Sequence, residues 1–212
     1  TLFHRIPGKA KIMSNKKYSA GLVSKRFWFY EIKQYIEMLN DGKSEKEIKQ
    51  LSEYVNIFGA PSESRAKEVF NATRRRVNII GKEMQELFPK LNIDNQKIVA
   101  LTSVLLLNDL FLEFMLEVYQ TQIKKGRMEI TTTEYKAFFS EKQRTNDSVA
   151  SWKPYTYSRL GSAYKNYLQE SGLIRENDSV DRITPKAIDP RVIQWLKTIN
   201  RLDIVQALTG GV

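Results

Sequence analysis

The clearest periodic pattern lies in residues 62–80, where apolar side chains recur at steps of three or four. Gly59 and Pro61 break the chain before this segment, and Ser62 is placed to accept hydrogen bonds from the free backbone N–H groups of a first helical turn. The pattern therefore predicts a helix that begins near Ser62. The residues expected on its apolar stripe are Ala66, Val69, Phe70, Thr73, Val77 and Ile80.

The opposite side of this helix is predicted to be polar and basic, so that residues 59–76 combine an apolar stripe with a cationic face. The polar face carries side chains that bind phosphate or hydrogen-bond to base edges, namely Ser64, Lys67, Asn71, Arg74, Arg75 and Asn78. A nucleic-acid-binding surface and an ordinary solvated helix face both fit this pattern, because Arg and Lys are common on each.

A second, short helix is predicted just upstream. Ser44 and Glu47 have the spacing of a capping box, and a linker over residues 55–61 leads from this helix into the next. Its apolar side would consist of Ile48, Leu51 and Tyr54. The order is that of a helix-turn-helix over residues 44–80, with a connection longer than the usual three or four residues. This context favours DNA binding.

Residues 96–124 are apolar on nearly all sides. A bilayer span needs about 20 mostly apolar residues, and an ionisable group near its centre costs on the order of 3 kcal/mol. Polar or charged residues interrupt the segment at Asn108, Asp109, Glu113 and Glu117. We therefore predict one buried central helix of a helical bundle, in which Glu113 and Glu117 pair with a basic residue of a neighbouring helix.

The C-terminal third predicts three short helices and a β-hairpin. The helices would begin at Thr131 or Thr132 and run through Phe139, run from Asn146 toward Trp152, and begin at Pro154. The hairpin would pair residues 173–175 with 182–184 around a polar turn at 176–181. This is the order of a winged helix, whose third helix is the one expected in the major groove.

The third of these helices has two distinct sides. Its apolar side would consist of Leu160, Tyr164, Tyr167 and Leu168. The residues expected to face solvent include Tyr155, Tyr157, Ser158, Arg159, Ser162, Lys165 and Asn166. A winged helix used for protein contact is the other interpretation, because the predicted turn is acidic (Glu176, Asp178, Asp181), whereas a wing beside phosphates is normally basic.

Composition narrows the possible functions. The 212 residues are 42% hydrophobic, include no cysteine, and contain a single histidine, His4. Thiolate chemistry, histidine-based acid–base catalysis and zinc sites of the usual kind are therefore excluded, and no glycine-rich phosphate loop is present. We predict a non-enzymatic protein without metal, cofactor or small-molecule substrate, and zero cysteine fits the reducing cytoplasm.

Charge and its distribution favour a polyanion as partner. The chain has 34 basic and 24 acidic residues, a formal net charge of +10, and the cations lie toward both ends. Residues 1–12 precede a Met-Ser-Asn-Lys-Lys stretch that resembles a natural start, and we interpret them as vector-derived or upstream translated sequence. The remainder is predicted to divide into a helical bundle (13–130) and a winged-helix domain (131–212).

Three segments together resemble the BrxA family of bacteriophage exclusion (BREX) systems: KYSAGLVSKRFWF (17–29), NIFGAPSESRAKEV (56–69) and YTYSRLGSAYKNYLQESGLI (155–174). The similarity extends over nearly all of 13–212. It implies a small, mostly helical, non-enzymatic protein of anti-phage defence that is implicated in DNA binding, with other BREX proteins as partners. The family has also been labelled as membrane proteins, and the charges in the central segment argue against that label.

These observations predict a mainly α fold, a helical bundle with an N-terminal helix-turn-helix and a C-terminal winged-helix unit, that binds double-stranded DNA largely through phosphates. The candidate contacts are Ser64, Lys67, Asn71, Arg74, Arg75, Tyr155, Ser158, Arg159, Ser162 and Lys165. Two alternatives remain: an assembly adaptor that docks on acidic proteins, and an RNA-binding bundle that uses Phe27, Trp28 and Tyr30. Core packing is the competing role for these aromatic residues.

Overall fold

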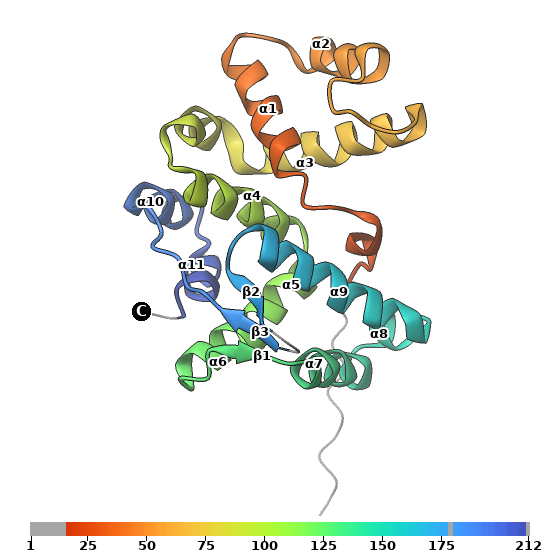
Figure 1. Ribbon diagram of the computed structural model, residues 1–212, viewed down its shortest axis with the longest axis vertical. Coiled ribbons are helices and arrows are strands. Elements are labelled where there is room, and N and C mark those ends of the chain that lie inside the picture. Colours follow the sequence, from red (N-terminus) through yellow and green to blue (C-terminus); the bar gives the residue numbers. More distant parts are fainter. Residues whose placement is uncertain (1–15, 178–179, 211–212) are drawn as a thin grey trace, which may run out of the picture.

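The computed structural model describes residues 16–177 and 180–210, so that residues 1–12, including His4, lie outside the described part of the chain. The fold is mainly α-helical with one small three-stranded antiparallel sheet, which confirms the predicted fold class. The elements form an elongated stack, with α1, α2 and α3 at one end and α6, α7 and the sheet toward the other (Figure 1).

The N-terminal end of the stack begins with the short 3-10 turn η1 and continues through three helices. The elements are η1 (Gly21–Ser24), α1 (Phe29–Asn40), α2 (Glu45–Gln50), a π-helical turn η2 (Leu51–Val55) and α3 (Glu63–Leu87). Ser44 and Glu47 form the predicted capping box, and the Ser62 hydroxyl accepts a hydrogen bond from the backbone N–H of Arg65 at 3.3 Å. Both predicted helix starts are therefore confirmed.

One residue of the predicted apolar side of α2 lies in solvent. Ile48 is fully buried, but Tyr54 is 83% exposed. Tyr54 belongs to η2, where the wider π-helical turn carries successive side chains through a smaller angle than an α-helix does. Placing Tyr54 in the apolar stripe by α-helical spacing was therefore wrong.

Helix α3 bends sharply at Gly81, whose φ is +74° and ψ is 166°. Glycine tolerates a positive φ because it has no Cβ. Beyond the bend, the Gln85 carbonyl accepts a hydrogen bond from the Asn40 side chain at 3.0 Å, and the Gln85 amide donates to the Val77 carbonyl at 2.9 Å. The C-terminal turn of α3 is thus bound both to α1 and to its own upstream half.

The predicted single central helix is two helices. α4 (Ile93–Leu107) follows the 3-10 turn η3 (Phe88–Lys90), and the next helical segment consists of α5 (Asp109–Phe114), η4 (Met115–Tyr119) and α6 (Gln120–Lys124). The two meet at an angle of 114°. Asn108 has extended backbone angles, and its side-chain oxygen accepts from the Phe111 N–H at 2.8 Å. Because the segment is apolar all round, it shows no periodicity that would reveal this break.

The residues at this bend form the centre of the core. The Phe111 ring stacks on that of Tyr164, with centroids 4.3 Å apart, and Phe114 stacks on Tyr135 at 5.0 Å. Within residues 16–177 and 180–210, no single helix combines the length and apolar character needed to cross a bilayer. α4 and the 109–124 segment reach that criterion only together, as a pair bent by 114°.

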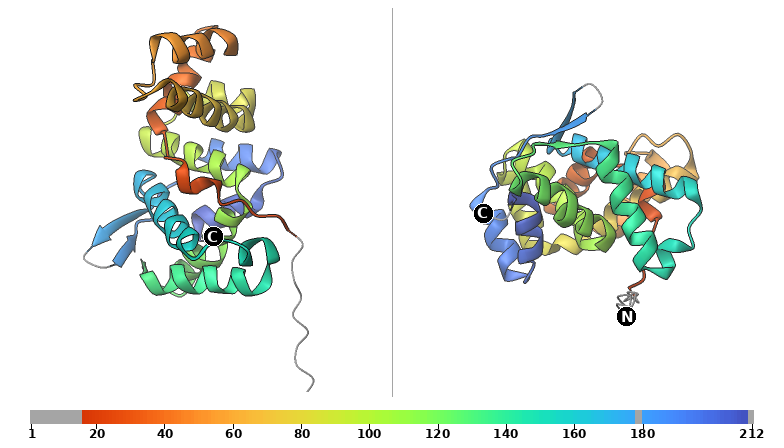
Figure 2. Two further views of the ribbon diagram at one scale, coloured as in Figure 1. Left: turned by 90° about the vertical axis from the view of Figure 1, so that its right-hand side faces the viewer. Right: turned by 90° about the horizontal axis from the view of Figure 1, so that it is seen from below.

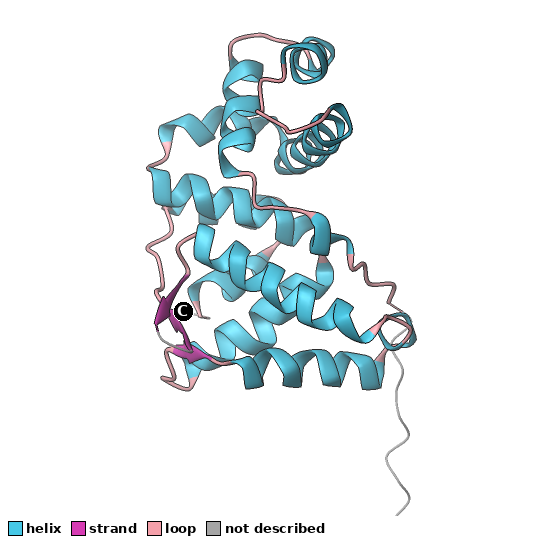
Figure 3. Cartoon of the chain, turned by 45° about the vertical axis from the view of Figure 1, so that its right-hand side comes forward, coloured by secondary structure: helices cyan, strands magenta, loops and turns pink. Residues whose placement is uncertain are grey.

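The other end of the stack carries the sheet, drawn in magenta in Figure 3. Its elements are β1 (Glu129–Ile130), α7 (Thr132–Thr145), α8 (Asp147–Ala150), α9 (Pro154–Glu170), β2 (Ile174–Asn177) and β3 (Val180–Ile183), and the chain continues into α10 (Pro190–Thr198) and α11 (Leu202–Thr209). The three predicted helices are confirmed. However, the first continues to Thr145, well beyond the predicted end at Phe139.

The predicted hairpin is present, but its turn is shorter than expected. Glu176 pairs with Asp181 across the β2–β3 ladder, so these two acidic residues lie in strands rather than in a turn, and Asp178 lies outside the described residues. The sheet also contains β1, which pairs with β3 in the order β1-β3-β2 and which is too short to show an alternating pattern.

Residues from both sides of the predicted boundary at 130/131 share this sheet. Ile130 of β1 lies opposite Asp181 of β3, and one cluster of buried apolar side chains includes residues from Leu22 to Leu208. The division into a bundle (13–130) and a winged-helix domain (131–212) stays a prediction.

Candidate nucleic-acid interface

Helix α3 buries the predicted apolar stripe and exposes most of the predicted polar face. All six stripe residues, Ala66, Val69, Phe70, Thr73, Val77 and Ile80, are buried. The residues exposed on the other side are Ser64, Lys67, Asn71, Arg75 and Asn78, while Arg74 is half-buried. The 3.6-residue period therefore placed the candidate contacts of this helix on its solvent side.

The cations of this face differ in how they are held. Arg74 lies 4.0 Å from a carboxylate oxygen of Glu45 and stands over the ring of Phe70. The side-chain amide of Asn78 donates to the same carboxylate at 2.7 Å. Lys67 and Arg75, in contrast, form no ion pair within the described residues. A polyanion would therefore meet two uncommitted charges and one that is partly neutralised.

Arg76, the last cation of the stretch predicted to be basic, is buried and only 4% exposed. Its guanidinium donates hydrogen bonds to the carbonyls of Arg26 at 2.9 Å and Phe27 at 2.6 Å, and to the Tyr167 hydroxyl at 2.7 Å. It forms no ion pair within the described residues. Burial lowers the pKa of the Arg76 guanidinium, although the Tyr167 hydroxyl opposes this effect.

The sequence contained a signal for this arginine. Position 76 lies three residues after Thr73 and four before Ile80, so it falls on the apolar stripe, and three successive arginines cannot all face one side of a helix. Arg76 therefore belongs to the interior of the protein rather than to its basic surface.

The second candidate helix, α9, also has the two predicted sides. Its apolar residues Leu160, Tyr164, Tyr167 and Leu168 are all fully buried. The predicted contacts at its start, Tyr155, Ser158, Arg159 and Ser162, are exposed. Arg159 forms no ion pair within the described residues. The exposed half of α9 therefore presents one free cation together with hydroxyl groups.

The hydroxyl groups of α9 are mostly engaged locally. Ser158 donates to the carbonyl of Tyr155 at 3.0 Å, and Ser162 donates to that of Ser158 at 3.1 Å. Tyr157 is half-buried and its hydroxyl donates to the carbonyl of Val149 at 2.7 Å. The expectation that Tyr157 is exposed was wrong, because its side chain closes the junction with α8.

Lys165 connects α9 to the hairpin. Its ammonium group lies 2.9 Å from a carboxylate oxygen of Glu176 and 3.0 Å from one of Asp181. Asp181 is only 3% exposed, and its other oxygen accepts from the Tyr135 hydroxyl at 3.1 Å. The hydrogen bond that Lys165 donates to Glu176 is the main cause that raises the pKa of Lys165. Two acidic residues of the hairpin thus neutralise a predicted DNA contact.

The N-terminal segment 17–28 lies between α3 and α9. Lys25 forms an ion pair with Glu68 of α3 at 2.6 Å, and its carbonyl accepts from the Tyr167 hydroxyl of α9 at 3.3 Å. The left view of Figure 2 shows α3, this segment in red and α9 following one another down the same side of the molecule. The two candidate helices are therefore joined by residues of a third segment.

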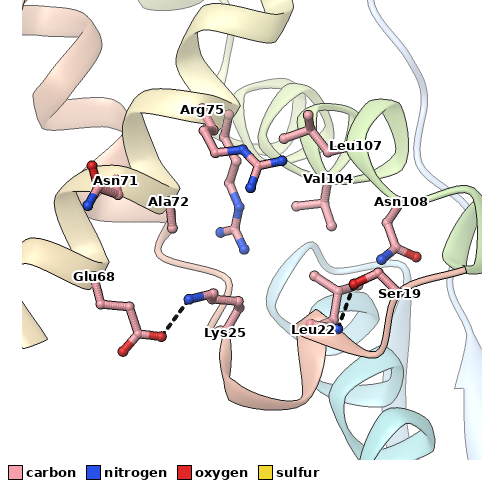
Figure 4. A pocket seen from close by; sticks show the side chains of 12 residues that line it. Ser19, Leu22, Lys25, Glu68, Asn71, Ala72, Arg75, Val104, Leu107 and Asn108 are labelled. Atoms are coloured by element: carbon pink, nitrogen blue, oxygen red, sulfur yellow. Dashed lines mark hydrogen bonds and ion pairs between the residues drawn. The ribbon is translucent and has the colours of Figure 1, made fainter.

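A pocket of about 390 Å³ opens beside this segment (Figure 4). We call it the Arg75 pocket. It lies between α3, η1 and the break at Asn108, and its polar lining includes Lys25, Glu68, Asn71 and Arg75. Two of the candidate contacts, Asn71 and Arg75, thus stand at its rim on α3.

Glu113 and Glu117, two acidic residues one turn apart in the central segment, both pair with a lysine. Lys142 of α7 lies 2.7 Å from Glu113 and 2.6 Å from Glu117, which confirms the predicted pairing with a neighbouring helix. Within the described ranges, no group of three or more His, Cys, Asp or Glu side chains is arranged to hold a metal ion.

Comparisons with known proteins agree over most of the chain. A family model described as BrxA matches residues 16–200. A curated relative, the BREX protein BrxA of Bacillus cereus (strain H3081.97), is 27% identical over 199 residues, which cover 94% of this chain and 100% of the relative. The crystal structure of an uncharacterized protein from Magnetospirillum magneticum superposes with a TM-score of 0.73 at 15% identity, covering 92% of this chain and 100% of that one. The structural match supports the fold alone.

Proposed function

The chain belongs to the BrxA family, and we propose that it is a non-enzymatic protein that binds double-stranded DNA in a bacteriophage exclusion (BREX) system. The name of the Bacillus cereus relative supports a role in such a system. The observation that carries the DNA assignment is the display of Lys67, Arg75 and Arg159 on α3 and α9, each exposed and without an ion pair in the described part of the chain.

Free cations matter because of how proteins bind DNA. Each phosphate that a Lys or Arg neutralises releases condensed counterions, which supplies most of the sequence-independent affinity. A cation already paired with a carboxylate, such as Lys165 with Glu176, must first exchange that partner. The affinity is therefore expected to come from Lys67, Arg75 and Arg159, with Arg74 contributing less.

The order of elements supports a winged-helix assignment for the second candidate surface. If the short helix α8 between α7 and α9 is set aside, the segment 109–124, β1, α7, α9, β2 and β3 run in the order helix, strand, helix, helix, strand, strand. We assign the segment 109–124 as the first helix of this unit, in place of the helix predicted at 131–139. α9 keeps its position as the helix that enters the major groove.

The first candidate surface is the α2–α3 unit. These helices have the order of a helix-turn-helix, and the connection through η2 and the loop to Pro61 is longer than in that motif. Asn56 closes this loop, because its side chain both accepts from the Ala60 N–H at 2.7 Å and donates to the Ala60 carbonyl at 2.8 Å. A fixed loop supports a rigid presentation of α3.

The test is a gel shift with duplex DNA over a range of salt concentrations. Affinity should fall linearly on a log–log plot against salt, and replacement of one phosphate-binding cation should reduce the slope by about 1. A flat salt response would count against phosphate binding.

Paired variants locate the contact surface. Arg74→Ala/Arg75→Ala should weaken binding to all sequences while leaving the unfolding temperature nearly unchanged, because both side chains contact solvent. The control is Lys82→Ala/Lys197→Ala, which removes the same charge from exposed positions beyond the Gly81 bend and on α10. Equal weakening in the two double variants would indicate a general charge effect and would remove α3 from the interface.

The two alternatives predict different outcomes. An assembly adaptor would capture partner proteins and give no gel shift. RNA binding by stacking loses support, because Phe27 and Trp28 are buried and only Tyr30 of the three aromatic residues is exposed. Competition between duplex DNA and structured RNA separates this alternative from the proposal.

A further inference from the structure

The Arg75 pocket has an imbalance of charge. Three cationic side chains line it, Lys25, Arg75 and Arg76, and among the described lining residues Glu68 is the one carboxylate. Glu68 is engaged by Lys25 at 2.6 Å and by Arg65 on the same helix. The hydrogen bond from Lys25 is the main cause that holds the pKa of Glu68 below its usual range. Neither the Arg75 nor the Arg76 guanidinium forms an ion pair within the described residues.

Burial of the Arg76 guanidinium costs free energy, because its charge is removed from water. Arg76 is almost fully removed from water, and its hydrogen-bond partners are two carbonyls and a hydroxyl, all of them neutral. A buried cation is favourable only when it is well hydrogen-bonded and paired with opposite charge. The hydrogen bonds of Arg76 are made to neutral groups, and the carboxylates of Glu31 and Glu170 act on its charge through space without forming an ion pair with it.

Neutral donors face the same space. The side-chain oxygen of Asn108 accepts from the Phe111 N–H at 2.8 Å, which leaves its amide nitrogen as a donor, and Figure 4 shows this nitrogen on the side of the pocket. Asn71 contributes a second amide from α3. A concave site with two guanidinium groups and amide donors has the chemistry that recognises an oxyanion.

We propose that the Arg75 pocket binds a phosphate group, with Arg75 at its rim, Arg76 at its base and the Asn108 amide as a further donor. Two sources carry this chemistry: a backbone phosphate of duplex DNA, in which case the assignment rests on the proposed function, and a free phosphate compound. The pocket lies beside the exposed face of α3, where a DNA backbone would pass if Lys67 and Arg75 contact it.

The first experiment measures the unfolding temperature of the full chain with inorganic phosphate or pyrophosphate, at constant ionic strength balanced with chloride. The wild type is compared with Arg75→Ala and with Lys67→Ala, a matched control that removes an unpaired cation from the same face of α3 outside the pocket. Phosphate also stabilises proteins by exclusion from their surface, and this part is the same in all three.

The expected result is a saturable stabilisation of the wild type and of Lys67→Ala, with phosphate binding about tenfold weaker in Arg75→Ala, as for the loss of a charge-assisted hydrogen bond. Equal phosphate-dependent shifts in the wild type and Arg75→Ala would overturn the proposal. Arg75 is exposed, so the variant is expected to fold.

The second experiment adds pyrophosphate to the gel shift and identifies the source. Displacement of the duplex from the wild type, together with weak binding by Arg75→Ala, assigns the pocket to a backbone phosphate. Stabilisation by pyrophosphate without displacement assigns it to a free phosphate compound. If no gel shift occurs but the Arg75-dependent stabilisation does, the proposed DNA binding fails and the phosphate site stands.

Discussion

The guanidinium of Arg76 on α3 donates a hydrogen bond of 2.7 Å to the hydroxyl of Tyr167 on α9, in the interior of the protein. The Tyr167 hydroxyl in turn lies 3.1 Å from the carbonyl of Arg26, which also accepts from Arg76. Three segments that are far apart in the sequence therefore meet at one buried cation.

This junction predicts a strong effect on stability. Arg76→Met keeps an unbranched side chain but leaves the Phe27 carbonyl without its donor and removes one of the two donors to the Arg26 carbonyl, and it should lower the free energy of unfolding by about 3 kcal/mol. Tyr167→Phe should cost about 1–2 kcal/mol. Urea denaturation of both variants and of the double variant measures the coupling. Strictly additive losses would show that the two side chains act independently.

Two glycines predict opposite effects of the same substitution. Gly81→Ala should destabilise the protein by about 1–2 kcal/mol, because its φ of +74° strains any residue with a Cβ. Gly161→Ala lies within α9, where a new Cβ would meet the rings of Phe139 and Tyr135 at 3.7 Å, an ordinary contact. It should be neutral or stabilising by up to about 1 kcal/mol. Thermal unfolding checks both, and equal signs would contradict the assigned bend.

The two cations of α9 should separate binding from stability. Lys165→Met leaves the carboxylate of Asp181, whose side chain is 5% exposed, without its ammonium partner, and should cost about 1–3 kcal/mol of stability. Arg159→Met should change stability by less than about 0.5 kcal/mol and weaken DNA binding. Denaturant titration and gel shifts on the same preparations provide the comparison. A large loss of DNA binding in Lys165→Met without loss of stability would instead indicate that Lys165 contacts DNA.

Glu113 predicts a dependence of stability on pH. Burial raises its pKa, but hydrogen bonds from Lys142, Tyr18 and Lys16 outweigh this and hold the pKa below its ordinary value of 4.5. A depressed pKa in the folded state means that the stabilisation is complete above the unfolded pKa and is lost as pH falls through the folded pKa. The stability gap between wild type and Glu113→Gln should therefore narrow below pH 4.5.

Denaturant unfolding of both proteins between neutral and acidic pH measures this gap. Glu83→Gln is the control, because Glu83 is exposed and forms no ion pair within the described residues. A gap for Glu113→Gln that stays constant over the whole range would contradict the role of the carboxylate charge.

Local spacing was sufficient for much of this fold. The capping residues Ser44, Ser62 and Thr131 and the stripe of α3 could be predicted because caps and helical periods depend on neighbours within a few residues. The exposed candidates on α3 and α9 followed from the same periodicity.

What sequence reasoning missed depends on distant partners. The break at Asn108 is the exception: its cap on the N–H of Phe111 is local, but the surrounding segment is apolar on every side, so helical periodicity does not reveal the break. β1 exists because β3 pairs with it. The link between Lys165 and Asp181, and the burial of Arg76 against Tyr167, join residues whose separation along the chain hides their contact.

The hydrogen bonds to the Arg26 carbonyl restrict how α3 and α9 can move relative to each other. Because Arg76 of α3 and Tyr167 of α9 both donate to this carbonyl, neither helix can rotate relative to the other without breaking one of these hydrogen bonds. The distance between the exposed faces of α3 and α9 is therefore already set in the unbound protein. A ligand that contacts both of these faces would therefore have to bend or twist to match their separation.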